Sequence, residues 1–295
     1  MIVSELVLGI MGALGSACTW ALICILAQAL SGRLTSAGIN AFRALVGGLI
    51  VFAGAVATGY GAEIVTMPLW VALTLWASIL IGYAGGDTVF FLGMQHLGVT
   101  RAHTLSMVHP LMSTAAGIVL FGEVMTPMRA AGILLVVGGI GLIVTGQSEG
   151  GAEASRLRRR GIWLVLVAAV AWTVGSVLLK PPLQVVSPVT ATAIRSPLAG
   201  FVLWLTPWAR GTWQAVRMTR GREAFVLAAV CLFSALSPIL YTFGIKYAGV
   251  AVGSVLSTTS PLFTIPLEIA VLGRWPTRRT VLGAVTTVLG IALMS

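Results

Sequence analysis

Five ionisable side chains lie inside long apolar segments of this sequence, and they are the residues that could do chemistry: Arg43, Asp87, His109, Arg195 and Glu268. If the segments cross a membrane, each charged group costs about 2.5–3.5 kcal/mol on insertion scales and therefore needs a partner, water or a function. A guanidinium can hold a carboxylate or a phosphate through two parallel hydrogen bonds, and a carboxylic acid or an imidazole can bind and release a proton. These residue types indicate recognition of a charged solute, proton transfer or internal pairing.

The two arginines occupy similar places in their segments. Arg43 lies seven residues after Ser36 and Arg195 lies seven residues after Pro188, which is roughly 10 Å along a helix that rises about 1.5 Å per residue. Either guanidinium can face a cavity and bind the carboxylate or phosphate of a substrate. Alternatively, it can extend to the nearby lipid headgroups or pair with a structural carboxylate.

The two acids, Asp87 and Glu268, also allow two interpretations. In a cavity, such a carboxylate can exchange a proton or attract the ammonium group of a substrate. Alternatively, each acid neutralises an arginine, so that Asp87 pairs with Arg43 and Glu268 pairs with Arg195.

Pro110 and Pro261 stand near the middle of two other apolar segments. A proline lacks the backbone N–H and frees the carbonyl four residues earlier, here that of Ser106 and of Ser257. Interrupted helices at matching positions point to a binding site at the membrane midplane. We expect Ser106, His109 and Ser257 to contribute polar groups there, while a simple kink whose serine bonds back to the backbone is the alternative at each proline.

Trp20 and Trp172 lie well inside their segments rather than at the ends, where aromatic residues form an interfacial belt. They can wall a cavity, or they can pack between helices. His96 and His103 lie nearer the segment ends, so we expect them at the interface.

The elements that must position these residues follow from composition. Of the 295 residues, 58% are hydrophobic and 9% are charged, whereas soluble proteins are about half apolar and about a quarter charged. About ten continuous apolar segments predict an all-α integral membrane protein with ten transmembrane helices, because a helix satisfies its own backbone polar groups in lipid. The expected spans are 5–29, 35–58, 69–94, 99–121, 127–146, 161–180, 188–209, 223–245, 250–272 and 277–294.

The same composition excludes other classes of function. The residues left between spans are too few for a separate catalytic or nucleic-acid-binding domain, and the net charge of +10 comes from Lys and Arg at the ends of apolar segments. The three cysteines fall inside apolar runs and form no metal-binding pattern, and the sequence has no GxxxxGK[ST] nucleotide loop. We expect no cofactor, no metal and no nucleic acid.

The sequence repeats itself on the two sides of a polar stretch. Trp20 and Arg43 match Trp172 and Arg195 at an offset of 152. At an offset of 151, Gly93, Gly98, Pro110, Gly122, Gly132 and Gly139 match Gly244, Gly249, Pro261, Gly273, Gly283 and Gly290. We predict two five-helix repeats, 1–146 and 161–295, joined by a polar linker, 147–160. Because five is an odd number of spans, the repeats should be inverted relative to each other, as in many transporters.

Several motifs resemble those of EamA-type transporters in the drug/metabolite transporter superfamily over essentially the whole chain. They are the arginine early in each second span, His109-Pro110-Leu111 and Ser260-Pro261-Leu262 in the fourth spans, Phe121-Gly122-Glu123 closing the first of these, and the glycine-rich fifth span. The resemblance implies a ten-helix carrier of small organic metabolites, often an exporter of amino acids. One departure is that the Gly-Glu pair recurs as Gly273-Arg274, so any role of that carboxylate is not symmetric.

The orientation is argued from charge. Thirteen Lys and Arg residues fall in the odd-numbered loops and three in the even-numbered loops, which by the positive-inside rule places both termini outside. The family resemblance implies cytoplasmic termini instead. In either orientation we expect a multi-pass protein of the plasma (inner) membrane, for which a monomer is sufficient because the second repeat supplies the inverted partner.

These observations predict a secondary transporter that exports a small polar organic metabolite such as an amino acid. Alternating access would occur at a midplane cavity between the repeats, driven by the gradient of the solute or by protons carried by Asp87, His109 or Glu268. Membrane lipids, the solute and protons are the expected partners. Two alternatives stay open: an intramembrane enzyme acting on a lipid or peptide, and a nontransporting receptor or assembly subunit.

Overall fold

The computed structural model describes residues 2–121, 127–145, 152–248, 253, 256–257, 259–273 and 275–294. Four residues of the motifs and repeats discussed above, Gly122, Glu123, Gly249 and Arg274, lie outside this part of the chain.

The described residues form helices and contain no strand, which confirms the all-helical prediction for them. The first half comprises α1 (Ile2–Leu30), α2 (Ser36–Ala57), α3 (Gly61–Thr66), α4 (Leu69–Ile79), the π-helix η1 (Leu80–Asp87), α5 (Thr88–Leu97), α6 (Val99–Ser106), α7 (Val108–Phe121) and α8 (Pro127–Thr145). The second half comprises α9 (Ala152–Leu179), the 3-10 helix η2 (Pro182–Gln184), α10 (Pro188–Leu205), the 3-10 helix η3 (Pro207–Ala209), α11 (Thr212–Met218), α12 (Arg222–Tyr247), α14 (Ser260–Leu272) and α15 (Arg278–Met294).

Five helical stretches in the described part of the chain are long and apolar enough to cross a membrane. They are Glu5–Leu30, Ser36–Ala57, Leu69–Leu97, Arg156–Gln184 and Arg222–Tyr247. The prediction of a multi-pass membrane protein is confirmed in this form, and the count of ten spans stays a prediction. α9 begins at Ala152, so its first turns are formed by residues that we expected in the polar linker.

The two prolines expected to break helices stand in first turns. The fourth predicted span is divided at Met107 into α6 and α7, and Pro110 is the third residue of α7. Pro261 is the second residue of α14, which begins at Ser260. A first turn suits proline, because the N–H groups there have no partner within the helix. The prolines therefore begin helices rather than interrupt continuing ones.

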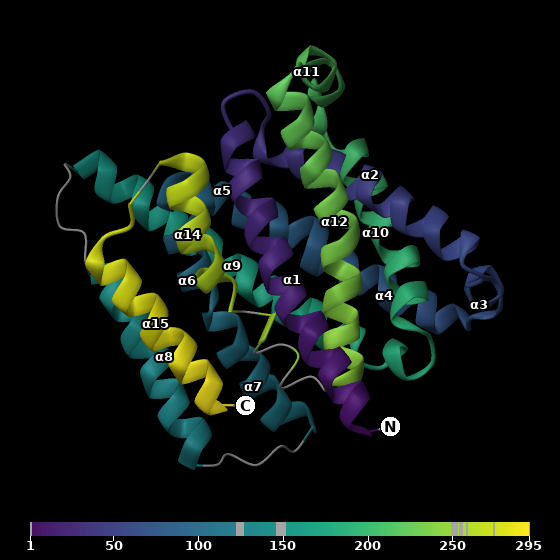
Figure 1. Ribbon diagram of the computed structural model, residues 1–295, viewed down its shortest axis with the longest axis horizontal. Helices are drawn as coiled ribbons and strands as arrows, with labels where there is room; N and C mark the ends of the chain where they lie inside the picture. The colour runs from purple at the N-terminus through teal and green to yellow at the C-terminus, as the bar shows by residue number, and fades with distance from the viewer. Residues whose placement is uncertain are drawn as a thin grey trace.

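The two halves pack against each other in a reciprocal way (Figure 1). α1 of the first half lies along α12 of the second, and α9, the counterpart of α1, packs against α4, η1 and α5, the counterparts of α12. α2 packs against its counterpart α10, and α8 packs against its counterpart α15. Such reciprocity is the property of two units related by a two-fold axis. The architecture of the chain is thus that of two repeats.

Close contacts of glycines show the same reciprocity between α2 and α10. A Cβ atom on Gly48 would lie 2.5 Å from the backbone nitrogen of Pro197, and a Cβ atom on Gly200 would collide with the backbone nitrogen of Leu45. Adding the repeat offset of 152 to 48 and 45 gives 200 and 197. The two backbones therefore meet at the same pair of positions twice, and only glycine permits that approach.

The pair formed by α8 and α15 behaves in the same way. A Cβ atom on Gly139 would lie 2.6 Å from the carbonyl oxygen of Gly283, and a Cβ atom on Gly290 would lie 2.6 Å from that of Gly132. These residues correspond at the offset of 151, as Gly132 with Gly283 and Gly139 with Gly290. Four of the glycines that revealed the duplication, Gly132, Gly139, Gly283 and Gly290, are thus residues at which the two halves touch.

Glu63 on α3 caps the first turn of α10, which belongs to the other half. Its Oε1 accepts a hydrogen bond from Ser187 N at 2.6 Å, and its Oε2 accepts one from Ser187 Oγ at 2.7 Å and another from Thr190 Oγ1. Partial burial acts to raise the pKa of Glu63, but the hydrogen bonds from Thr190 and Ser187 outweigh it and leave the pKa below its usual value. An ionised Glu63 thus stabilises the contact between the halves.

This cap predicts a loss of stability on acidification. Because the pKa of Glu63 is lower in the folded protein than in the unfolded chain, its contribution is present above about pH 4.5 and is lost as the pH falls through the folded value. The apparent Tm of the detergent-solubilised protein should fall over this range by more in the wild type than in Glu63→Gln. Glu5→Gln, which changes an exposed acid of α1, serves as the control and should behave as wild type. Equal acid-induced decreases in all three proteins would contradict the cap.

Candidate functional site

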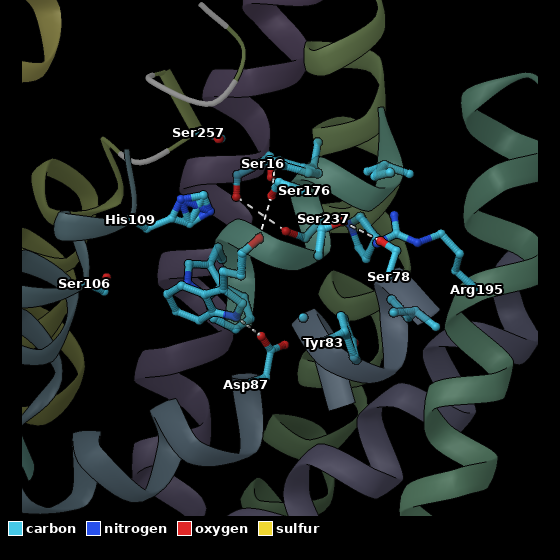
Figure 2. A pocket seen from close by; sticks show the side chains of 18 of the residues that line it. Ser16, Ser78, Tyr83, Asp87, Ser106, His109, Ser176, Arg195, Ser237 and Ser257 are labelled. Atoms are coloured by element: carbon cyan, nitrogen blue, oxygen red, sulfur yellow. Dashed lines mark hydrogen bonds between the residues drawn. The ribbon is translucent and has the colours of Figure 1, made fainter. Parts of the chain in front are cut away.

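A cavity of about 190 Å³ lies between the two halves, and helices of both halves line it (Figure 2). Seven of the nine side chains that the sequence analysis expected at the site line this cavity: Trp20, Asp87, Ser106, His109, Trp172, Arg195 and Ser257. Arg43 and Glu268, the other two, are not among its lining residues. Two regions far apart in the chain therefore converge on one space.

Asp87 is positioned by an irregular stretch of helix. It is the last residue of the π-helix η1, which separates α4 from α5. π-helical turns often occur at functional sites because they shift side chains out of the regular helical register. The corresponding residue of the second half is Pro238, which lies inside α12 and removes a backbone donor there. Matching positions of the two halves thus carry the end of a π-helix in the first half and a proline inside a continuous α-helix in the second.

Arg43 and Asp87 form a buried ion pair, in which 1% of Arg43 and 4% of Asp87 is exposed. Arg43 Nη1 also donates to Tyr83 Oη at 2.7 Å, and its guanidinium lies 4.6 Å from the centre of the Tyr83 ring and 4.9 Å from that of Phe91. Trp172 Nε1 donates to the second oxygen of Asp87 at 2.8 Å. Of the two interpretations that the sequence left open for Arg43, the structure shows pairing with a carboxylate.

Arg195 has different surroundings, although it is the repeat counterpart of Arg43. It lines the cavity, and its Nη2 donates to Ser78 Oγ at 3.0 Å. Ser78 Oγ in turn donates to the carbonyl oxygen of Gly175 at 2.6 Å. In the described part of the chain, no carboxylate forms an ion pair with Arg195. The two arginines are therefore equivalent in position but not in charge balance.

The suggested pairing of Glu268 with Arg195 is wrong. Glu268 lies on α14 and accepts hydrogen bonds from Thr100 N, at 3.3 Å, and from Thr100 Oγ1, both on α6. The physical reason is that α14 packs against α1, α6 and α15, whereas Arg195 lies on α10. With 7% of its surface exposed, Glu268 joins the two halves at a place outside the cavity.

Contacts of α6 with α14 extend to the next turn. His103 Nδ1 lies 2.9 Å from Ser260 Oγ, and the His103 ring meets the Phe90 ring edge-on at 5.2 Å between centroids. Only 1% of His103 is exposed, because α14 covers this short helix. His96 is exposed. The position of both histidines at the membrane interface stays a prediction.

Aromatic side chains form one wall of the cavity. Trp20 and Trp172 are repeat counterparts, and they meet each other edge-on with 6.1 Å between ring centroids. Phe90 lies against both indoles, and the His109 ring lies 6.2 Å from that of Trp172. Because equivalent residues of two symmetric units touch only at the axis that relates them, this pair places the cavity at the pseudo-two-fold axis.

The sequence analysis missed several hydroxyl groups that line the cavity: Ser16, Ser78, Tyr83, Ser176, Ser237 and Tyr241. Three of them could have been found from their spacing along the chain. Ser16 lies four residues before Trp20, and Ser176 lies four residues after Trp172, so each shares a helix face with a tryptophan. Tyr83 has the same spacing from Asp87. The cavity therefore combines aromatic surface, hydroxyl groups and one arginine.

Comparison with known proteins places this geometry in context. Residues 7–145 and 159–295 each match the protein family described as the EamA-like transporter family. A chloroplastic WAT1-related protein of Arabidopsis thaliana is 26% identical over 274 residues, which are 87% of this chain and 62% of that protein. This chain thus spans less than two thirds of the length of that relative. A solved crystal structure aligns with 100% of this chain and 98% of its own, with a TM-score of 0.69 and 18% sequence identity, which shows a shared fold.

Proposed function

The chain belongs to the EamA-like transporter family, and from this premise we propose that it is a secondary transporter that exports a small polar organic metabolite, such as an amino acid, from the cell. It is a multi-pass membrane protein, and we place it in the plasma (inner) membrane. The solute binds in the cavity between the repeats and is exposed to each side of the membrane in turn. One chain is sufficient for this cycle.

The observation that carries this proposal is a cavity lined in part by ionisable and hydroxyl groups at the axis of two reciprocally packed repeats. Secondary transporters bind their substrates at the interface between repeats, where a rocking motion of one repeat against the other changes access. Here Trp20 and Trp172 meet at that interface, and Asp87 and Arg195 face the same space from different halves. Polar and ionisable groups gathered inside a membrane protein mark a solute pathway more often than a packing core.

The enzyme alternative needs a nucleophile, a base and a group that orients the base. Ser113 Oγ lies 3.1 Å from His109 Nδ1, but these residues are four apart on one helix, a spacing at which a serine commonly bonds to its neighbour. Asp87, the acid of the cavity, is already bonded to Arg43 and Trp172. The arrangement favours solute binding over covalent chemistry.

The experiment that tests the function begins with ligand binding. Wild-type protein purified in detergent is screened for a rise in apparent Tm against amino acids, nucleosides, sugars, organic acids and small amines, because a ligand of the folded state stabilises it. Any stabilising class is then tested for flux in proteoliposomes against protein-free vesicles. Binding without flux would support the receptor alternative, and flux of no solute class would reject the transporter proposal.

Proton coupling is part of the proposal, with Asp87 and His109 as the groups that face the cavity. Glu268 bonds to Thr100 outside the cavity and is the weaker candidate of the three. Uphill solute flux in proteoliposomes should follow an imposed pH gradient and should collapse when a protonophore removes that gradient. If solute flux is the same with and without the pH gradient, the transporter works by facilitated diffusion and the proton proposal is wrong.

A further inference from the structure

We propose that the solute recognised in this cavity is an organic monoanion whose carboxylate binds Arg195. This inference rests on the transporter function proposed above, and it narrows the substrate from small polar metabolites in general to organic monoanions, in preference to the amino acids named there as an example. Three features of the cavity carry it: the charge balance of the two arginines, the free donors of Arg195, and the engagement of both oxygens of Asp87.

The charge balance differs between the two halves. Arg43 is neutralised by Asp87, whereas the residue that corresponds to Asp87 in the second half is Pro238, which carries no charge. Arg195 therefore faces the cavity without an acidic partner among the described residues. A buried cation without a counter-ion is costly, so an anion that enters the cavity completes the charge balance that the second half lacks.

The geometry leaves the guanidinium of Arg195 ready to bind. The side chain lies against the cavity and points toward Ser78 (Figure 2), and 8% of the residue is exposed. Its hydrogen bond to Ser78 uses one of five N–H groups, and its Nε has no hydrogen-bond partner in the described structure. Ser78 gives its own proton to Gly175, so it can only accept from the arginine and holds it in place. A planar group fixed in this way suits a carboxylate.

The rest of the cavity indicates why a zwitterion is not preferred. An ammonium group in a membrane interior needs a compensating negative charge, but Arg43 already neutralises the charge of Asp87, whose other oxygen accepts from Trp172. What remains for the body of the ligand is the aromatic wall of Trp20 and Trp172, which offers apolar contact. The hydroxyl groups of Ser16, Ser106 and Ser176 offer neutral hydrogen bonds. An anion with an apolar or neutral polar body fits these groups better than an amino acid does.

The charge count also separates a carboxylate from a phosphate. The cavity holds one unpaired cation among its described lining residues, which balances a single negative charge. A phosphate monoester carries about −1.5 to −2 at neutral pH and has three acceptor oxygens, which call for a cluster of cations. Arg43 cannot supply the second cation, because Asp87 already neutralises its charge.

The test compares ligands that differ only in charge. Apparent Tm and proteoliposome flux are measured with a panel of monocarboxylates from acetate to 3-phenylpropanoate, with the neutral amide of each acid, with the matching amino acids, including phenylalanine, and with inorganic phosphate. At least one carboxylate should bind at least about tenfold more tightly than its amide, because the amide cannot form the charge-assisted bonds to Arg195. The matching amino acid should bind more weakly than that carboxylate.

Variants assign the effect to the residue. Arg195→Met should remove the preference for the carboxylate over the amide, and Arg195→Lys should weaken it, since a lysine retains the charge but lacks the planar pair of donors. Arg217→Met is the matched control, because Arg217 lies on α11 and stacks on Trp213 outside the cavity. This control should keep the wild-type preference.

The outcomes distinguish this inference from the function on which it rests. A preference for the amino acid, the amide or phosphate in wild-type protein, or an unchanged carboxylate preference in Arg195→Met, would overturn the monoanion proposal and leave the transporter function intact. Flux of no solute of any class would overturn the transporter function itself. The comparison of acid and amide in the wild type remains decisive even if an Arg195 variant does not fold.

Discussion

Alanine in place of Gly200 is expected to destabilise the protein strongly, whereas alanine in place of Gly54 is not. A Cβ atom at Gly200 would collide with the backbone of α2 at Leu45, and backbone cannot move aside as a flexible side chain can. Overpacking costs about 1–3 kcal/mol where side chains can adjust, so we expect the upper end of this range or more. Gly48→Ala, the mirror substitution on α2, should have a similar effect against Pro197.

Gly54 provides the matched control for these variants. It lies on α2, as Gly48 does, but no atom lies within 4 Å of a Cβ atom placed on it. Gly54→Ala should therefore leave the apparent Tm unchanged or raise it slightly, because alanine favours the helix by about 1 kcal/mol. Thermal unfolding in detergent, followed by size-exclusion chromatography, measures all three variants. If Gly200→Ala unfolds at the same temperature as Gly54→Ala, α2 and α10 do not approach each other as described.

Loss of one arginine should be far more harmful than loss of its repeat counterpart. Arg43→Met leaves Asp87 as an uncompensated charge, and breaking a buried ion pair in this way costs about 3–5 kcal/mol. Arg195→Met leaves no charge behind, because no described carboxylate pairs with it. Without ligand, Arg195→Met should therefore be as stable as the wild type or more stable. The free energy of unfolding, from denaturant titration in detergent, measures the difference.

A double variant tests the cause of this asymmetry. Asp87→Asn alone should also be destabilising, because it leaves the guanidinium of Arg43 buried without a counter-ion. Combining Arg43→Met with Asp87→Asn removes both charges and should recover much of the lost stability, so the two effects should not add. Additive losses in this cycle, or an equal loss in Arg43→Met and Arg195→Met, would show that the ion pair does not account for the difference.

Much of the site could be predicted from the sequence because residues of the first repeat recur at matching positions of the second. Trp20 matches Trp172, and Arg195 matches Arg43. The structure places Trp20, Trp172 and Arg195 at the cavity. The helices themselves follow from continuous apolar composition, since a backbone in lipid satisfies its polar groups locally. The hydroxyl groups of Ser78 and Tyr241 carried no comparable signal, because serine and tyrosine are unremarkable in a membrane helix until the neighbouring helix is known.

The sequence named Asp87 as a possible partner of Arg43, and the structure shows this pair, but the sequence could not decide which acids pair with which arginines. The alternatives for Arg43 and Glu268 could not be separated, because an ion pair depends on which helices meet and at what height rather than on spacing along one helix. The π-helix at η1 and the burial of His103 under α14 also result from contacts between segments distant in the chain. A pair of Glu268 with Arg195 was one of the two alternatives, but Glu268 bonds to Thr100, since α14 packs on α6.

The sequence by itself determined that this protein is a duplicated, helical membrane protein, because continuous apolar segments and repeated glycines can be read along the chain without knowledge of its contacts. Only the tertiary structure decided that the two halves are symmetric in backbone and asymmetric in charge. The close contacts of Gly48 with Pro197 and of Gly200 with Leu45 repeat under the two-fold relation. The partners of the two arginines do not, because one acid in the first half has a proline as its counterpart. That difference leaves Arg195 as the one arginine among the described residues that line the cavity. No motif indicates this, because it depends on the contact between Arg43 and Asp87, which are far apart in the chain.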